Sequence, residues 1–527
     1  MDYLIHHMLR TSAARYPDKA AMVHGERRLS YREVADGCTS IAAGLRNAGV
    51  KRGERVGIYL DPSVDQVLSI FSISQTGAVY VPINTVLFPD QVAHIVRDCG
   101  MKALITTPEK LEALLPVLRD IPSLDFYVVT GNPNGWGHEN AEDNGKRIHS
   151  LEAMLRLPAP EQWLDWGISK DLAAILYTSG STGKPKGVML SHANIMAGSS
   201  VVSAYLGITS EERILAVLPF SFDAGMNQLM TAFQQGGTIV LIKFVFAKEI
   251  IKALLEERIT ALAGVPTVWS LLTNGGLQKQ SFPHLRYITN TGGAMPQAVL
   301  KILRQALPST KIFLMYGLTE AFRSTYLPPE ELDRRPTSMG KAIPDNEILV
   351  LNDQGQLCAP GEVGELVHRG STVSMGYWGN PEATARVLKP NPLLPPELGD
   401  CERVCYSGDL VKMDEDGFLY YVGRRDTMIK SSGYRISPTE VEEVLFQTGK
   451  IRQAAVIGVP DDVLGQSIKA FLVARNGEEV DCDSVLDYCA ERMPRHMVPK
   501  HFELLPELPK TSSGKVDYPA LRRREGL

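Results

Sequence analysis

The stretch Tyr177-Thr-Ser-Gly-Ser-Thr-Gly-Lys-Pro-Lys-Gly-Val188 decides how the rest of the chain is interpreted. It follows a short apolar run, 172–176, that has the length of a buried strand, and it leads into 189–194, which we interpret as the entry to a helix. Glycines let backbone N–H groups turn toward an anion, hydroxyl groups donate further hydrogen bonds, and lysines supply positive charge. The stretch therefore predicts a loop that handles phosphate.

This loop differs from the common P-loop, in which G-x-x-x-x-G-K-[ST] opens a helix. Gly180 and Gly183 are three residues apart, and Pro185 follows Lys184 where a P-loop has its magnesium-binding hydroxyl. Proline lacks an N–H group and disfavours helix at the residue before it. We therefore expect a mobile loop that closes over a triphosphate. A flexible Gly/Ser linker is the alternative, but linkers rarely follow a buried strand or carry paired lysines.

Length and composition set the class of protein. A chain of 527 residues exceeds the usual size of one domain, and 44% hydrophobic with 22% charged residues is ordinary for a globular protein. A net charge of −5 gives no reason to expect nucleic-acid binding. The seven cysteines lack zinc spacing, which predicts free thiols. With neither a signal-like N-terminus nor a long apolar run, we expect a cytoplasmic protein without a membrane span.

Short apolar runs alternate with helical patterns up to about residue 340, which predicts an α/β fold with parallel-rich sheets flanked by helices. Predicted strands end at Tyr177, Asn290 and Tyr316, and ligands of such sheets bind beyond strand ends, so we expect these three to converge. Beyond 340, short strands with Gly and Asp turns predict a small β-barrel-like region. Ser437 then begins a helix, as its cap, in a small α+β domain. The predicted domains are 1–424 and a mobile 425–527.

Six motifs in order along the chain resemble those of the AMP-forming acid ligases, which include acyl-CoA synthetases, peptide-synthetase adenylation domains and luciferases. They are the 177–188 loop, Gly292-Gly-Ala294, Tyr316-Gly-Leu-Thr-Glu320, Ser407-Gly-Asp409, Gly423-Arg-Arg-Asp426 and Gly514-Lys515. The resemblance implies that ATP and a small carboxylic acid form an acyl-AMP with release of pyrophosphate, and that the acyl group then passes to a thiol. It implies ATP, Mg²⁺ and CoA as cofactors, or the phosphopantetheine of an acyl carrier protein in place of CoA.

The same resemblance implies a role for each motif residue. Thr178, Ser179, Gly180, Ser181, Thr182, Gly183 and Lys184 would hold the β- and γ-phosphates, and Glu320 with Thr178 would hold Mg²⁺. Gly292, Gly293 and Ala294 would line the adenine, Tyr316 would stack on it, Thr319 would meet the α-phosphate, and Asp409 and Arg424 would bind the ribose. Such groups suit the reaction because a carboxylate attacking an anionic triphosphate needs charge neutralisation and positioning.

The C-terminal motifs would act in turn. Lys515 would bridge the α-phosphate and the acid during adenylation. Asp426 would be the hinge about which the small domain rotates, bringing Gly433, Tyr434 and Arg435 to a thiol tunnel. Each residue also has an ordinary interpretation from its local sequence. Glu320 could form a surface salt bridge, Tyr316 could be core packing, Asp409 and Asp426 could be turn residues, and Arg424 and Lys515 could be solvated charges.

The acid itself is open. Phe222, Asp223 and Gly317 are the candidate pocket residues. Phe222-Asp223 resembles peptide-synthetase domains, in which the Asp pairs with an amino group, so a pocket-lining Asp223 would require a cationic substrate, whereas an Asp223 that caps the next helix would leave an apolar pocket.

Three further segments resemble the exosortase A-associated acyl-CoA ligases, bacterial proteins found with PEP-CTERM sorting systems: 221–228, 320–336 and 340–344. We therefore expect an AMP-forming acid–thiol ligase whose thiol acceptor is CoA. The alternatives are a free-standing adenylation enzyme that loads an amino or acyl group onto a carrier protein, and a non-catalytic AMP-binding sensor.

Overall fold

A computed structural model describes the chain in two compact units. The described residues are 2–131, 142–158, 165, 167–178, 185–399, 401–425, 427–431, 434–461, 464–475, 478–511 and 514–527. The first unit comprises Met1–Ile348, His368–Asn391 and Pro396–Cys405, and the second comprises Leu349–Val367, Pro392–Pro395 and Tyr406–Leu527. Each unit is described by itself. The predicted division at 424/425 stays a prediction.

The first unit contains an eight-stranded sheet with the order β10-β9-β4-β3-β5-β6-β8-β7. Its strands are β3 (Arg55–Tyr59), β4 (Val79–Pro82), β5 (Ala103–Thr106), β6 (Phe126–Val129), β7 (Glu142–Asp143), β8 (Lys146–Ser150), β9 (Leu172–Thr178) and β10 (Lys186–Ser191). The pairings from β9 to β8 are parallel, and only the outermost strands, β10 and β7, run antiparallel to their neighbours. The predicted parallel-rich sheet is confirmed.

A nine-stranded sheet with the order β17-β16-β15-β14-β13-β11-β12-β1-β2 completes the first unit's sheets. Its strands are β1 (Ala20–His24), β2 (Arg27–Ser30), β11 (Arg213–Ala216), β12 (Thr238–Leu241), β13 (Ala261–Gly264), β14 (Tyr287–Asn290), β15 (Lys311–Leu318), β16 (Ala321–Leu327) and β17 (Lys341–Ala342). The five strands from β15 to β12 and their neighbour β1 run parallel, and β2, β16 and β17 pair antiparallel at the two edges.

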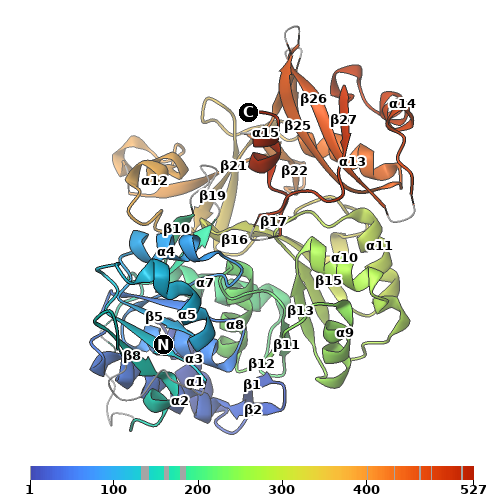
Figure 1. Cartoon of the computed structure of the whole chain (residues 1–527). Coiled ribbons are helices and arrows are strands. Elements are labelled where there is room, and N and C mark those ends of the chain that lie inside the picture. The colour runs from blue at the N-terminus through green and yellow to red at the C-terminus, as the bar shows by residue number, and fades with distance from the viewer. Residues whose placement is uncertain are drawn as a thin grey trace. The chain divides into compact units, whose positions relative to one another are not determined.

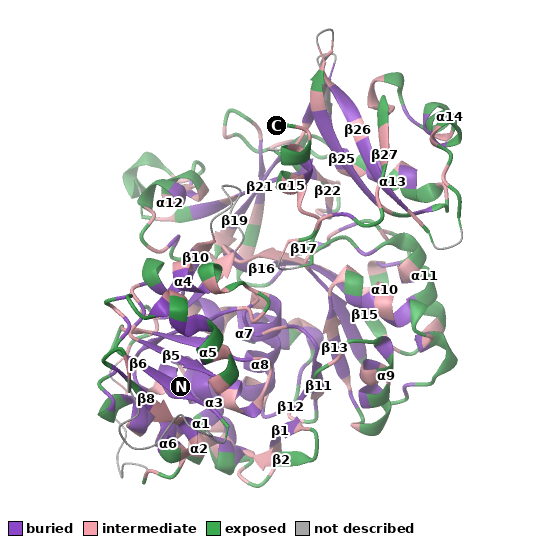
Figure 2. Ribbon diagram, viewed as in Figure 1, coloured by how far each residue is buried: buried purple, intermediate pink, exposed green. Residues whose placement is uncertain are grey.

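Helices cover both faces of these sheets (Figure 1). The central layer holds α1 (Ile5–Arg15), α2 (Tyr31–Asn47), α3 (Val64–Gln75), α6 (Leu151–Leu155), α7 (His192–Leu206) and α8 (Asp223–Gln235), and its core cluster includes residues of both sheets. The outer helices are α4 (Pro89–Asp98) and α5 (Pro108–Leu118) on the eight-stranded sheet, and α9 (Ala247–Glu256), α10 (Pro266–Asn274) and α11 (Gln297–Ala306) beside the nine-stranded sheet. The strands between the layers are largely buried, as Figure 2 shows.

Serine side chains cap the starts of two helices in the first unit. The Ser30 hydroxyl oxygen accepts a hydrogen bond from the Glu33 N–H, and the Glu33 carboxylate accepts one from the Ser30 N–H, which makes a capping box at the start of α2. Ser63 likewise accepts from the Gln66 N–H at the start of α3. These bonds satisfy N–H groups that the first helical turn leaves without partners.

A third sheet has the order β18-β19-β21-β20, with β22 paired to β21, and three of its strands continue along the chain from one unit into the other. Its strands are β18 (Asn346–Leu351), β19 (Val363–Gly370), β20 (Leu388–Pro390), β21 (Arg403–Met413) and β22 (Leu419–Arg424), and α12 (Pro381–Val387) precedes β20. This sheet corresponds to the small β region that the sequence predicts beyond residue 340.

The second unit also holds a sheet with the order β24-β23-β26-β25, to which β27 adds beside β26. Its elements are β23 (Ile429–Ser431), β24 (Tyr434–Ile436), α13 (Pro438–Gln447), β25 (Ile451–Asp461), β26 (Gly465–Ala474), α14 (Cys482–Arg492), β27 (His501–Leu504) and α15 (Tyr518–Arg524). The prediction that the Ser437 side chain caps α13 is wrong. Ser437 stands at the cap position, but its hydroxyl donates to the Val422 carbonyl and makes no cap hydrogen bond.

Glu442 joins two helices of this unit and carries a pH-dependent contribution to its stability. Its Oε1 accepts from the Tyr518 hydroxyl at 2.6 Å and from the Val456 N–H at 2.8 Å. Burial raises the pKa of Glu442 from 4.5 to about 7. Because the folded chain holds this proton more tightly than the unfolded chain, the stabilisation is complete below pH 4.5 and is lost as the pH rises through about 7.

We expect Glu442→Gln to abolish most of that pH dependence, because the amide keeps the Oε1 acceptor and does not ionise. Above pH 7 the variant should be more stable than the parent by about 2 kcal/mol. The measurement is the free energy of unfolding of the second unit, obtained from denaturant titrations at a series of pH values. Glu440→Gln, at an exposed position of the same helix, is the control. An unchanged pH profile in Glu442→Gln would refute this role.

Candidate functional site

The predicted strand at the start of the quoted stretch is β9, and a second strand that was not predicted, β10, precedes the helix. β9 ends at Thr178, and β10 begins at Lys186 and pairs with it in antiparallel register, Lys186 opposite Thr178. The helix α7 starts only at His192, so the interpretation of 189–194 as a helix entry is wrong for its first half. Ser179, Gly180, Ser181, Thr182, Gly183 and Lys184 lie outside the described residues.

Neighbouring elements anchor the described strands of this hairpin. The Tyr177 hydroxyl donates to Asp98 Oδ2 at 2.6 Å, which ties the end of β9 to α4. On the other strand, the Trp378 N–H donates to the Gly187 carbonyl at 2.8 Å, and the Trp378 indole donates to the Asp98 carbonyl at 3.1 Å. Hydrogen bonds therefore fix both strands next to the predicted phosphate loop, β9 to α4 and β10 to Trp378.

The motif Tyr316-Gly-Leu-Thr-Glu320 lies in a second hairpin. β15 ends at Leu318, Thr319 and Glu320 form the turn, and β16 returns antiparallel from Ala321. The close approach of the two strands favours glycine at Gly317, because a Cβ atom there would lie 3.2 Å from Cα of Arg323 on the returning strand, a tight contact. Sequence reasoning identified β15 but missed β16.

Tyr377 connects the two hairpins. Its hydroxyl donates to Glu320 Oε1 at 2.6 Å, and its backbone bridges to Val188 of β10. The ammonium group of Lys186 lies 5.7 Å from the centre of the Tyr377 ring. Glu320 and the strand that follows the predicted phosphate loop thus meet at one tyrosine.

The Glu320 carboxylate is suited to a divalent cation. It is half-buried, and among the described residues no lysine or arginine forms an ion pair with it, which argues against the surface salt bridge considered above. Tyr377 occupies Oε1, and Oε2 accepts no hydrogen bond from the described residues. Carboxylate and hydroxyl oxygens are ligands that Mg²⁺ prefers, so this donor set fits that ion.

We expect Tyr377→Phe to weaken the Mg²⁺ dependence of the reaction by about tenfold, because partners that orient a metal-binding carboxylate contribute about this much to affinity. Activity would be measured as a function of Mg²⁺ concentration at saturating ATP. Tyr420→Phe removes another hydroxyl–carboxylate bond, 3.1 Å to Asp414, that does not involve Glu320, and it should leave the Mg²⁺ dependence unchanged. Equal effects in both variants would contradict this role of Tyr377.

The predicted adenine-binding residues lie just after strand β14 and on its neighbour β15. Gly292 and Gly293 follow β14, and Gly292 has φ +76°, a conformation that favours glycine. Ala294 is exposed beside them. Tyr316 lies on the adjacent β15, half-buried, with its ring nearly parallel to that of His368, at 9° and 6.0 Å between centroids. Burial lowers the pKa of His368 to about 3, so this ring beside Tyr316 is uncharged at neutral pH.

Two of the three strand ends that were predicted to converge are adjacent in the structure, and the third is connected to them through Tyr377. The ends near 290 and 316 belong to adjacent parallel strands of the nine-stranded sheet. The end at 177 belongs to the eight-stranded sheet, and Tyr377 supplies its connection to Glu320.

In the second unit, Asp409 and Arg424 are opposite each other on β21 and β22. Arg424 Nη1 donates to Asp409 Oδ1 at 3.1 Å and to the Ser407 carbonyl at 2.9 Å. Asp409 is 7% exposed, and its N–H donates to the Ser407 hydroxyl. Gly408 has φ +74°, so the backbone of β21 next to Asp409 favours glycine. The sequence placed both residues at the ribose separately, and the structure pairs them.

The remaining predicted residues of this unit are described only in part. Lys515 is exposed, and its ammonium group has no partner among the described residues, while its carbonyl accepts from the Thr511 N–H at 2.7 Å. The predicted hinge Asp426 and the predicted tunnel residue Gly433 lie outside the described residues. Tyr434 and Arg435 begin β24, and their side chains are likewise outside the description.

A cavity of about 30 Å³ lies between α7, α8 and the nine-stranded sheet. Its described lining is Val202, Leu206, Ile208, Ile214, Ala224, Asn227, Gln228, Thr231, Ala261, Ala263, Tyr287, Thr289, Thr291, Met315 and Arg323. Phe222, Asp223 and Gly317 are not in this lining. Phe222 is the N-cap of α8 without a side-chain cap bond, and Asp223 is the first helical residue, so Asp223 is not the cap either.

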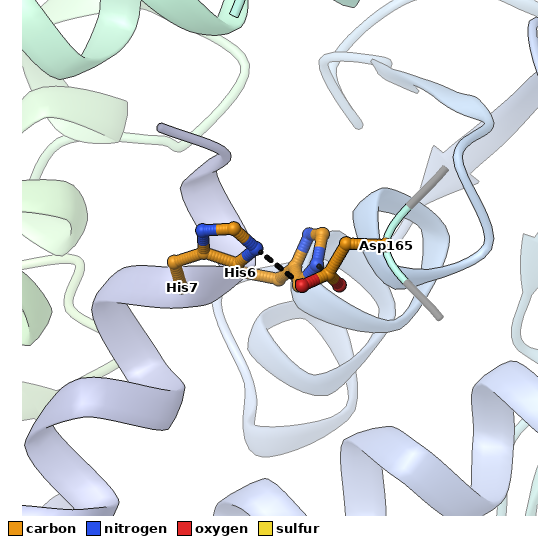
Figure 3. Close-up of side chains that lie close together, drawn as sticks. All are labelled: His6, His7 and Asp165. Atoms are coloured by element: carbon orange, nitrogen blue, oxygen red, sulfur yellow. Dashed lines mark hydrogen bonds and ion pairs between the residues drawn. The ribbon is translucent and has the colours of Figure 1, made fainter. Parts of the chain in front are cut away.

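A histidine cluster that sequence reasoning missed lies at the start of the chain. His6 Nε2 and His7 Nε2 lie 3.0 Å and 2.9 Å from the two carboxylate oxygens of Asp165, toward which both rings point (Figure 3). Arg10 also pairs with Asp165, at 2.6 Å. Burial lowers the pKa of His7 to about 4. Since Asp165 already has a cationic partner, we interpret the cluster as an anchor for residue 165 and not as a metal site.

Comparison with known proteins identifies the family of this chain. Residues 9–378 match the model of the AMP-binding enzyme family, and residues 440–515 match that of the AMP-binding enzyme C-terminal domain. The chain is 32% identical over 527 residues to a feruloyl-CoA synthase of an Amycolatopsis species, covering 97% of this chain and 96% of that protein. It is 29% identical over 541 residues to a long-chain-fatty-acid–CoA ligase of Bacillus subtilis, covering 98% and 93%.

The fold has a solved counterpart in the anthranilate CoA ligase AuaEII in complex with anthranoyl-AMP, with a TM-score of 0.87, 26% identity and coverage of 99% of this chain and 97% of that chain. The chain belongs to the AMP-binding enzyme family. It is an AMP-forming acid–thiol ligase of the acyl-CoA synthetase type. In the described part of the chain, no helix has both the length and the apolar character needed to cross a bilayer.

Proposed function

We propose that this ligase activates a small carboxylic acid with ATP and Mg²⁺ and transfers the acyl group to CoA in the cytoplasm. The observation that carries the proposal is the hydrogen bond from Tyr377 to Glu320, which holds a carboxylate beside the strand that follows the predicted phosphate loop. Phosphoryl chemistry depends on cations and donors fixed around the triphosphate. Glu320 and Thr178 would hold Mg²⁺, which supplies charge neutralisation when bound.

Within this proposal the other residues of the first unit position the nucleotide. The 178–184 loop donates hydrogen bonds and charge to the β- and γ-phosphates, and Thr319, in the turn next to Glu320, meets the α-phosphate. Tyr316 stacks on the adenine, and the 292–294 segment borders it through backbone groups. The positive φ of Gly292 supports this role, because it turns the backbone of the segment at the end of β14.

The second unit contributes the ribose contact and the reacting cation. Asp409 accepts hydrogen bonds from the ribose hydroxyls, and Arg424 holds the Asp409 carboxylate in place through the 3.1 Å bond between them. Lys515 bridges the acid and the α-phosphate. For thioester formation the predicted C-terminal domain, 425–527, rotates about Asp426, and the segment that contains Gly433, Tyr434 and Arg435 meets the thiol.

The thiol acceptor separates this proposal from its competitor, loading of a carrier protein. The test incubates the protein with ATP, a panel of fatty, aryl and amino acids, and either CoA or a phosphopantetheinylated carrier protein. We expect equal amounts of AMP and acyl-CoA. AMP with a thioester on the carrier alone would support the adenylation enzyme, and nucleotide binding without AMP formation would identify a sensor. We also propose membership in the exosortase A-associated group, supported by the sequence of 320–336.

A further inference from the structure

The cavity beneath β15 holds polar atoms that have no partner in the protein. Arg323, Asn227 and Gln228 line it and are 4%, 3% and 7% exposed. Arg323 Nε, Asn227 Nδ2 and Gln228 Oε1 form no hydrogen bond with the described residues. Buried polar atoms are normally paired, so three unpaired atoms around one cavity indicate a group that the protein alone does not supply.

Arg323 is the one charged residue in the described lining. Its Nη1 donates to the Thr291 hydroxyl at 3.3 Å, and no described Asp or Glu pairs with it. A guanidinium group stays charged inside a protein, and burying it without a counter-ion is costly. Water in the cavity would satisfy its N–H groups but would not neutralise it, which favours an anion as the missing partner.

The backbone holds this arginine in an unusual conformation. Arg323 has φ +76°, which non-glycine residues rarely adopt, and it lies within the register shift between the Leu318–Ala321 and Tyr316–Thr325 pairs of β15 and β16. Its Cα packs closely on Gly317, in the strand that carries the Tyr316–Glu320 motif. Strained residues of this kind are found where function requires a particular orientation. The cavity therefore lies directly beside the strand that leads to Glu320.

We propose that the acid activated by this ligase carries a second anionic group of the carboxylate type, and that Arg323 and Asn227 bind that group at the end remote from the reacting carboxyl. This inference rests on the proposed function, because the proposed function is what identifies the ligand as the acid substrate. The cavity of about 30 Å³ accommodates a terminal group of a few atoms. The cavity therefore favours acids that have a negatively charged group at the remote end, and it is too small for a long alkyl tail.

The test compares aliphatic and aromatic dicarboxylic acids with their monoamides, which have nearly the same shape but one charge fewer. We expect ATP–pyrophosphate exchange to favour a diacid over its monoamide by about 30-fold in kcat/KM. Arg323→Met should remove this preference by lowering kcat/KM for the diacid alone. Asn227→Asp keeps the shape of the side chain and places a competing carboxylate in the cavity, so it should also disfavour the diacid. Arg386→Met, at an exposed position, is the control.

Calorimetric binding of each acid without ATP separates this inference from the proposed function. Diacid binding that is lost in Arg323→Met, with no exchange activity, would support the pocket and count against the ligase assignment. Exchange that prefers the monoamides, or a diacid preference that persists unchanged in both variants, would overturn the inference and leave the ligase assignment standing. Absence of diacid binding and of diacid exchange in the parent protein would also overturn it.

Discussion

Replacing Lys515 by alanine is expected to lower the rate of acyl-adenylate formation by about 10³-fold, because the variant lacks the cation that would offset the charge developing between the acid and the α-phosphate. The side chain is exposed and has no partner among the described residues, so its loss should not unfold the second unit. The second half-reaction uses a preformed acyl-AMP and does not need this cation. Thioester formation from supplied acyl-AMP should therefore change less than about threefold.

The matched control for this variant is Lys510→Ala. Lys510 is in the same C-terminal segment and pairs with Glu507, and it should be dispensable for both half-reactions. The two half-reactions would be followed separately, as pyrophosphate exchange and as thioester formation from synthetic acyl-AMP. An alanine variant of Lys515 that adenylates at the parental rate would remove Lys515 from the site. Equal losses in both half-reactions would indicate damage to the unit as a whole.

Glu320→Gln is expected to lower adenylate formation by about 10²-fold at physiological Mg²⁺ concentration. The amide keeps an oxygen that accepts the 2.6 Å hydrogen bond from Tyr377, so the packing of the hairpin is preserved while the negative charge is lost. A weaker cation site should be partly rescued by raising the Mg²⁺ concentration. The measurement is the rate of pyrophosphate exchange at increasing Mg²⁺, with melting temperature as the check on folding.

The control for this second variant is Glu382→Gln, which removes a carboxylate from an exposed pair on α12 of the same unit. It should leave the Mg²⁺ dependence unaltered. If Glu320→Gln retained the parental rate at every Mg²⁺ concentration, Glu320 would not be a ligand of the ion. The interpretation of Glu320 as a salt-bridged surface residue would then need a partner outside the described residues.

Much of the fold was predictable because its signals are local. The capping box of Ser30 and Glu33 depends on residues three apart, and the alternation of apolar and helical segments depends on short windows. The motif residues were predictable from the resemblance, which gives their order along the chain. The antiparallel strands β10 and β16 were missed, because the pattern of each strand does not identify the strand with which it pairs.

The contacts between the motifs could not be predicted, because they join distant residues. Tyr377 is 57 residues from Glu320, and nothing in its local sequence marks it as a partner of that carboxylate. Arg323 belongs to a strand that alternates little in character, and its burial beside Asn227 depends on the packing of α8 against the sheet. Ser437 illustrates the opposite error, since a good local cap was overridden by the nearby Val422 carbonyl.

The central claim is that one chain first forms an acyl-adenylate and then transfers the acyl group to a thiol. A single-turnover experiment with ATP labelled at the α-phosphate, excess enzyme and a saturating acid, begun without CoA and completed by its addition, measures both steps. We predict that labelled acyl-AMP accumulates on the enzyme and is converted to acyl-CoA and free AMP when CoA is added. Labelled ADP as the product, or no labelled adduct with any acid of the panel, would contradict the account.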